Sequence, residues 1–342
     1  MALRVTDHAP EAMLADTPRA RSRAFLVALA LITVVPLVGI PLIMAFAMAR
    51  GSGFIPGTLT ILLITGPMHV AATGFFYFDP AFRPVLGESR SRCVWSLLWL
   101  PFAIGALGLS GNALIGPWGY RTIFSLHNVW LFYHYQRQNF GLASFISTYV
   151  GTGRLPARVN TVMNLTALGA ILSLLGMPGF YPYTDAILAD RGYLVLHTAG
   201  TILYAISLLG MIWVFWSEPR LRENAWVTLG LLVALAFFLP TVLFQTSAMA
   251  FFPVAVAHGA QYILMMMVVS GRSSRGLIGL GIMCAVAAVA GLAMDAMRVW
   301  PVILLATGLV QVHFLVDAKV WRLREQRQRA IMNDRFDFLL AG

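Results

Sequence analysis

The sequence predicts an all-α integral membrane protein: a bundle of about ten transmembrane helices with both termini in the cytoplasm. Three observations predict this class. Of the 342 residues, 59% are hydrophobic, only 11% are charged, and the basic residues fall mainly between long apolar runs. A soluble domain contains roughly 25% charged residues. The alternation of apolar and polar residues that membrane-barrel strands require is absent, so the predicted spans are helices.

Ten apolar runs are long enough to cross a membrane, which takes about 20 residues per helix. They are residues 24–48, 55–78, 93–115, 118–145, 160–178, 193–216, 226–244, 250–270, 277–294 and 299–319. Pro240 and Pro253 flank the short connection between the seventh and eighth runs, where a re-entrant loop is the alternative to two spans. Cys93 and Cys284 lie in apolar surroundings and are interpreted as core thiols, not as a disulfide or a metal site.

Two segments of different composition flank the predicted bundle at 24–319. Residues 1–23 are polar, carry mixed charges and two prolines, and precede an apolar run that lacks a small-residue cleavage pattern. This predicts a disordered cytoplasmic tail rather than a cleaved signal peptide. Residues 320–342 are rich in arginine and predict a basic cytoplasmic tail.

The positions of the lysines and arginines predict the orientation of the bundle. Nineteen of the 24 fall in the tails and in alternate loops on one side, four fall on the other side, and Arg137 lies within a span. Cytoplasmic loops of membrane proteins carry such an excess, so both termini are predicted to be cytoplasmic. The net charge of +10 is explained by this topology and does not indicate a nucleic-acid partner. The expected location is a bacterial inner (cytoplasmic) membrane, with the bilayer as a partner.

The segment 127–141, HNVWLFYHYQRQNFG, places polar side chains inside a predicted span. His127 and His134 are seven residues apart, about two helical turns, and Gln138 continues the same face. Polar side chains at membrane depth are energetically costly, and they usually face the interior of a bundle at a functional site. This face is therefore predicted to line a cavity or to hold a ligand.

Six of the seven histidines lie in predicted spans, and five are candidate metal ligands: His69, His127, His134, His258 and His313. The helix rise of about 1.5 Å per residue assigns His69, His134 and His313 to a deeper layer and the other two to a shallower one. The residues predicted to hydrogen-bond these ligands or a substrate are Gln138, Asn139, Gln261, Tyr262 and Asp317. A single intramembrane histidine is often only an interhelical hydrogen-bond partner, contributing about 0.6 kcal/mol. Five such residues on four spans favour a shared metal or haem site.

The composition of this cluster predicts a function. Neutral imidazoles suit iron, copper or zinc, and few carboxylates lie near the histidines. The leading interpretation is a metal-dependent oxidoreductase or oxygenase, with non-haem iron, that acts on a lipophilic small molecule or lipid. The methionines at 265–267 suit an apolar substrate. Two alternatives stay open: a haem-binding electron carrier or haem-handling protein with paired axial histidines, and a proton-coupled transporter.

Two short segments carry a resemblance to a known family. AHGAQY at 257–262 and FYHYQRQNFG at 132–141 are similar to the His-Gly and His-Phe-Gly segments of the Brp/Blh carotene dioxygenases. Those are polytopic, histidine-rich membrane oxygenases thought to hold a non-haem iron. The resemblance implies oxidative cleavage of a polyene. The closely paired histidines of that family are not reproduced, and the HxxHH boxes of fatty acyl desaturases are absent.

Overall fold

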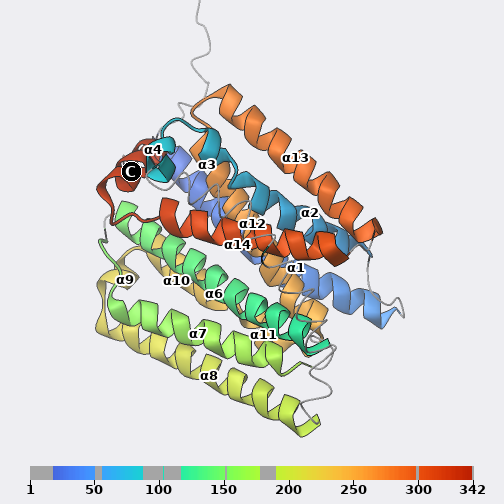
Figure 1. The fold of residues 1–342 in the computed structure, drawn as a ribbon. Coiled ribbons are helices and arrows are strands. Elements are labelled where there is room, and N and C mark those ends of the chain that lie inside the picture. The colour runs from blue at the N-terminus through green and yellow to red at the C-terminus, as the bar shows by residue number, and fades with distance from the viewer. Residues whose placement is uncertain are drawn as a thin grey trace, which may run out of the picture.

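A computed structural model describes residues 18–50, 56–87, 103, 117–150, 152–177, 190–297 and 300–340 (Figure 1). Every regular element in this part of the chain is a helix, which confirms the predicted all-α class. The helices are α1 (Pro18–Ala49), α2 (Pro56–Ala72), α3 (Phe75–Phe78), α4 (Arg83–Gly87), α6 (Pro117–Tyr149), α7 (Ala157–Leu175), α8 (Asp190–Ser217), α9 (Arg220–Glu223), α10 (Ala225–Ala236), α11 (Leu239–Leu243), α12 (Ser247–Ser270), α13 (Ser274–Met297), α14 (Trp300–Val320), α15 (Gln326–Arg335) and α16 (Asp337–Leu340).

Among the described residues, six candidate membrane spans are long and apolar enough to cross a bilayer: α1, α7, α8, α12, α13 and the pair α10–α11. Helices α6 and α14 are more polar than these six, but with 33 and 21 residues they are also long enough to cross a bilayer. The outer helices expose large apolar side chains, such as Leu194 and Trp216 on α8, which are 67% and 79% exposed. Exposed apolar surface of this extent is expected of side chains that face lipid. The chain is therefore described as an integral membrane protein.

The helices lie roughly side by side, with α8 and α13 at opposite edges of the bundle and α6, α12 and α14 between them (Figure 1). Helix α12 is the most buried of the six candidate spans: 67% of its 18-residue apolar stretch lies inside the bundle, against 17% for α13. Polar side chains on α12 are therefore held away from lipid. On α13, Cys284 is a buried free thiol, as predicted for a core cysteine, whereas Cys93 lies outside the described residues.

Three predicted spans differ from the helices of the structure. The predicted span 55–78 is interrupted after α2 by a turn at Thr73 and Gly74, since glycine weakens a helix. The predicted span 226–244 is divided into α10 and α11 at residues 237–238, because Pro240 has no backbone N–H to continue the helical hydrogen bonds. The predicted span 93–115 lies outside the described residues, apart from residue 103.

Helix α1 begins at Pro18, six residues before the predicted span. Proline favours the first turn of a helix, because its φ angle is already helical and its missing N–H would be unpaired there. This corrects the prediction that a disordered tail extends to residue 23. The remainder of that predicted tail, residues 1–17, lies outside the described residues.

The C-terminal segment packs onto the bundle through α15 and α16. Phe336, between these two helices, is fully buried. Its ring centroid lies 5.9 Å from that of Phe25 on α1 and 4.7 Å from that of Phe145 on α6. The predicted basic tail at 320–342 is thus folded over most of its length. The start of α1 and the C-terminal helices lie at the same end of the bundle (Figure 1).

Candidate metal centre

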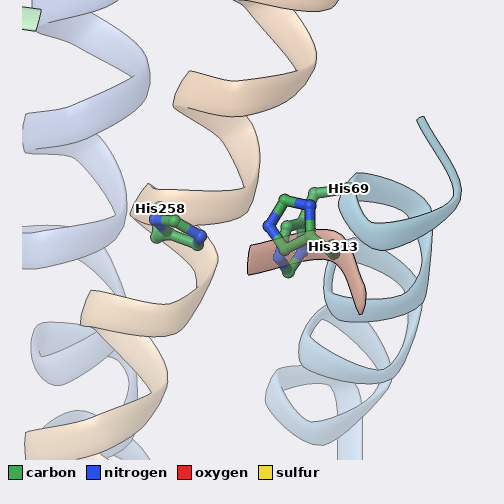
Figure 2. A group of neighbouring side chains, drawn as sticks. All are labelled: His69, His258 and His313. Atoms are coloured by element: carbon green, nitrogen blue, oxygen red, sulfur yellow. The ribbon is translucent and has the colours of Figure 1, made fainter. Parts of the chain in front are cut away.

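Four histidines on four different helices meet inside the bundle: His69 on α2, His134 on α6, His258 on α12 and His313 on α14. The ring centroids form a closed circuit in the order 69, 258, 134, 313, with neighbours 4.9, 5.1, 5.0 and, closing the circuit, 4.9 Å apart. Figure 2 shows three of these side chains gathered between their helices. We call these four residues the histidine circuit.

The potential ligand atoms of the histidine circuit are close enough to share an ion. His69, His258 and His313 form one group whose ligand atoms lie within 4.8 Å of one another. A second group within the same limit combines His134 and His313 with Asp317. Two ligands that each lie about 2.1 Å from one ion can be at most about 4.2 Å apart. Small side-chain movements would therefore bring either group to ligand spacing, and His313 is common to both.

Each member of the histidine circuit keeps a buried ring nitrogen with no hydrogen-bond partner in the described part of the chain. These atoms are Nε2 of His69, His134 and His313 and both ring nitrogens of His258. A buried polar atom left unpaired costs about 1–3 kcal/mol, and few such atoms occur in folded proteins. Their concentration at one point indicates a site for a ligand that these nitrogens would bind.

The hydrogen bond of His69 fixes which of its nitrogens carries the proton. Its Nδ1 atom lies 3.2 Å from the carbonyl oxygen of Thr65, one turn earlier on α2. A carbonyl oxygen only accepts, so Nδ1 donates and Nε2 keeps its lone pair. Gly259 on α12 allows the close approach of the two helices here, since a Cβ at that position would lie 3.1 Å from the same carbonyl oxygen.

A chain of hydrogen bonds fixes the protonated nitrogen of His313 in the same way. The Tyr262 hydroxyl donates to Oδ1 of Asp317 at 2.7 Å, so it accepts from the Thr73 hydroxyl at 2.7 Å. Thr73 has then used its proton and must accept from His313 Nδ1, 2.6 Å away. His313 therefore carries its proton on Nδ1, and Nε2 is the lone-pair nitrogen. Partners of this kind orient metal-binding histidines in proteins.

A carboxylate and two aromatic rings complete the surroundings of the histidine circuit. Oδ2 of Asp317 lies 3.7 Å from Nε2 of His313, so this carboxylate could bind an ion or support His313. The Phe314 ring stacks on His134 with centroids 4.1 Å apart, and the Tyr135 ring lies 4.1 Å from that of His258. These contacts restrict the orientation of the two imidazoles.

Beside the histidine circuit lies a layer of side-chain amides formed by Gln138, Asn139 and Gln261. Gln138 Nε2 donates to the carbonyl oxygen of His258 at 3.2 Å and to Oε1 of Gln261 at 3.0 Å. Gln261 Nε2 donates to Oγ1 of Thr33 at 3.0 Å and to Oδ1 of Asn139 at 3.3 Å. Of the three predicted amides, Gln138 thus contacts the main chain of a circuit histidine, Gln261 and Asn139 follow it in the network, and none of these bonds reaches an imidazole ring.

Three other ionisable residues lie apart from the circuit. The Nδ1 atom of His127 is 2.7 Å from Nε2 of Gln311 on α14. His197 bonds through Nδ1 to a carbonyl oxygen on α7 at 3.2 Å. Asp79 forms an ion pair with Arg335 at 2.9 Å. The structure therefore brings four of the five predicted metal ligands together and leaves His127 outside that group.

The assignment of His258 to a shallower layer differs from the structure, in which its ring contacts those of His69 and His134. Helix α12 begins at Ser247, three residues before the predicted span, which places His258 deeper in the bundle. Sequence reasoning missed Thr65 as the hydrogen-bond partner of His69, and it associated Thr73 with His69 and not with His313, which Thr73 contacts. Their four-residue spacing on either side of His69 is the only signal in the sequence that points to them.

None of the known protein families, curated proteins or solved structures compared with this chain matches it. Its function must therefore be argued from the geometry of the site.

Proposed function

We propose that this protein is a metal-dependent membrane oxidoreductase, an oxygenase that acts on a lipophilic substrate at a non-haem iron. The proposed ligands are the four residues of the histidine circuit, with Asp317 as a further ligand or a hydrogen-bond acceptor. One observation carries the proposal: imidazoles from four helices converge, and each keeps a buried nitrogen without a partner among the described residues. We leave His127 out of the ligand set because it bonds to Gln311.

The residues around the proposed iron are suited to a site inside a membrane. Neutral imidazoles bind a metal without adding charge, so the bilayer interior holds only the charges of the ion and of Asp317. When bound, the iron would supply O₂ binding and one-electron chemistry. The chain itself holds protons on Nδ1 of His69 and His313, which leaves Nε2 of both free to ligate.

A haem protein is the first alternative. Two axial histidines hold a haem between them and need a flat slot for the porphyrin. In the histidine circuit, the space between any two opposite rings is flanked by the other two rings, only 4.9–5.1 Å away. This geometry favours a single ion over a porphyrin. A proton-coupled transporter is the second alternative, supported by the hydrogen-bonded chain from His313 through Thr73 and Tyr262 to Asp317.

For the topology, we propose ten spans with both termini in the cytoplasm, in a bacterial inner membrane. The excess of basic residues in the tails and in alternate loops supports this orientation. Two ion pairs join the C-terminal tail to loops that are predicted to lie on the same side of the membrane. Arg272, after α12, pairs with Asp334 on α15, and Arg335 pairs with Asp79 after α3. Reporter fusions at residue 342 and at residues 185–191 should report opposite sides of the membrane.

Metal analysis and an optical spectrum of the detergent-purified protein test the function. We expect about one iron per chain and no Soret band. A Soret band would establish the haem alternative. Protein that contains neither metal nor haem, even after incubation with ferrous iron, would contradict the proposal and favour the proton path.

Replacement of Tyr262 by phenylalanine should weaken metal binding about 10–100-fold, the usual effect of losing a residue that orients a ligand. Without the Tyr262 hydroxyl, the Thr73 proton is free to turn toward Nδ1 of His313. His313 would then carry its own proton on Nε2, the nitrogen needed for the metal. Tyr204→Phe is the matched control, because that buried hydroxyl bonds to a backbone oxygen away from the site. Chelator competition measures both affinities, and equal affinities in the two variants would refute this role of Tyr262.

A further inference from the structure

A cleft on the side of the bundle lies between α1, α6, α10 and α12. It is a shallow, half-open cleft, and the figure of about 420 Å³ for its empty space includes the part open to the outside. Its walls consist of aliphatic side chains and Trp226, and none of the described residues that line it is charged. Besides Trp226, the polar side chains that reach it from the described residues are Thr33, Asn139 and Gln261. The latter two belong to the amide layer beside the histidine circuit.

The hydrogen bonds of the amide layer have only one consistent direction. The carbonyl oxygen of His258 can only accept, so the atom of Gln138 that contacts it is the amide nitrogen. That nitrogen also donates to Gln261, whose contacting atom is therefore its oxygen. The second polar atom of the Gln261 amide is then its nitrogen, Nε2, which donates to Oγ1 of Thr33 and to Oδ1 of Asn139. The positions of the nitrogen and oxygen atoms in all three side-chain amides therefore follow from the carbonyl oxygen of His258.

This network ends at the Nδ2 atom of Asn139. Both N–H groups of Gln138 and both of Gln261 have acceptors, but Nδ2 of Asn139 has none within the described residues, although the side chain is only 2% exposed. An unpaired buried amide N–H costs about 1–3 kcal/mol. Asn139 lines the apolar cleft, so an acceptor supplied by a ligand there would satisfy this group.

We propose that the cleft is a binding site for a neutral, elongated apolar molecule that carries one acceptor oxygen, such as a ketone, ester, ether or hydroxyl oxygen. A small movement of the buried Asn139 side chain lets its Nδ2 atom donate to the acceptor, and the apolar remainder lies along the aliphatic walls of the cleft. A carboxylate or phosphate group does not fit, because no cationic side chain lines the cleft to compensate for its burial. A saturated or unsaturated hydrocarbon without oxygen fits the walls but leaves the amide unpaired.

The amide layer connects the cleft to the helices α6 and α12 of the proposed metal centre. Gln261 follows His258 by three residues, Asn139 follows His134 by five, and Gln138 bonds to the main chain of His258. An acceptor oxygen on Asn139 would therefore anchor a molecule close to the histidine circuit. That this molecule is the substrate rests on the proposed function, whereas its binding in the cleft rests only on the amide network and the cleft walls.

Photolabelling of the purified full-length protein tests the inference. Two probes of equal length carry a diazirine at the same position, one with a mid-chain ketone and one without oxygen, and labelled peptides are identified by mass spectrometry. One neutral hydrogen bond contributes about 0.5–1.5 kcal/mol, so the ketone probe should label the cleft segments of α1 and α10 roughly 2- to 12-fold more strongly. Asn139→Leu should bring this ratio close to one.

A second pair of variants keeps the test decisive if Asn139→Leu does not fold. Ala30 lines the cleft on α1, so Ala30→Phe should reduce labelling by both probes. Ala45 lies on the same helix but is exposed and outside the cleft, so Ala45→Phe should leave labelling unchanged. Equal labelling by the two probes in the unmodified protein would overturn the inference. Labelling of the cleft segments that Ala30→Phe does not reduce would also overturn it. A phospholipid probe that labels these segments as strongly as the ketone probe would overturn it as well.

The same experiment separates this inference from the proposed function. Labelling is repeated with His313→Ala protein, whose fold and cleft should be intact but whose metal site is incomplete. A preserved preference for the ketone probe supports the cleft as a binding site. Absence of metal from the unmodified protein refutes the proposed function, and the labelling ratio still decides the inference about the cleft.

Discussion

Replacement of His313 by alanine should abolish metal binding while leaving the protein inserted and folded. His313 is the only residue common to both groups of potential ligand atoms, and its ring is a neighbour of those of His69 and His134. Even a residue that merely supports a ligand changes metal affinity about 10–100-fold when it is replaced. Loss of a ligand should therefore reduce the metal content of the purified protein by more than about tenfold. Metal analysis, normalised to protein and paired with a measurement of helical content, gives the result.

Two further histidines serve as controls for this experiment. His127→Ala should leave the metal content unchanged, because His127 bonds to Gln311 outside the circuit. His197→Ala should also leave it unchanged, because His197 bonds to the main chain of α7. His134→Ala should behave like His313→Ala. Equal metal content in all four variants would show that the circuit is not the binding site and that its histidines serve helix packing or proton transfer.

The fold class was predictable from the composition together with the absence of strand-like alternation. A chain with this many apolar and this few charged residues can satisfy its backbone in a bilayer only as helices or as a closed barrel. Helix ends were less predictable, since they depend on single residues. Pro18 starts α1 earlier than hydropathy indicates, and Pro240 divides a span that hydropathy treats as continuous.

The candidate ligands were predictable by residue type, but their arrangement was not. Polar residues stand out against an apolar span, and this identified all four members of the histidine circuit. Depth was estimated by counting residues along each helix, which neglects the exact helix start and the tilt. His258 therefore appeared shallower than His69, although their ring centroids lie 4.9 Å apart.

The hydrogen-bond partners were the least predictable part of the site. Thr73 contacts His313 across 240 positions of sequence and Tyr262 across 189. No helical periodicity relates residues so far apart, and apolar spans contain many threonines. Asp79 shows the same dependence on packing: it lies only ten residues after His69, yet its carboxylate pairs with Arg335, 256 positions away. Only the packing of helices distinguishes such cases.

Removal of the Arg335 side chain should strongly destabilise the docking of the C-terminal helices. Nη2 of Arg335 lies 2.9 Å from Oδ2 of Asp79, and the two side chains are only 11% and 7% exposed. Arg335→Ala leaves a buried carboxylate without its counter-charge, which costs about 3–5 kcal/mol. Asp79 follows α3, which continues from the turn that contains Thr73, so the pair also anchors the helix end beside the metal centre. Denaturant unfolding of the detergent-solubilised protein measures the change in the free energy of unfolding.

An exposed ion pair on the same C-terminal segment provides the matched control for this effect. Arg272 pairs with Asp334 at 3.1 Å and with Asp337 at 3.2 Å, but the three side chains are 44%, 65% and 55% exposed, so Arg272→Ala should cost only about 0–1 kcal/mol. The double variant Asp79→Asn, Arg335→Met removes both buried charges, and the amide oxygen of the introduced asparagine would still accept the hydrogen bond that Asp79 receives from the backbone N–H of Ala81. It should therefore recover most of the lost stability. If Arg335→Ala cost no more than Arg272→Ala, water would reach the Asp79 carboxylate and the pair would not anchor the C-terminal helices.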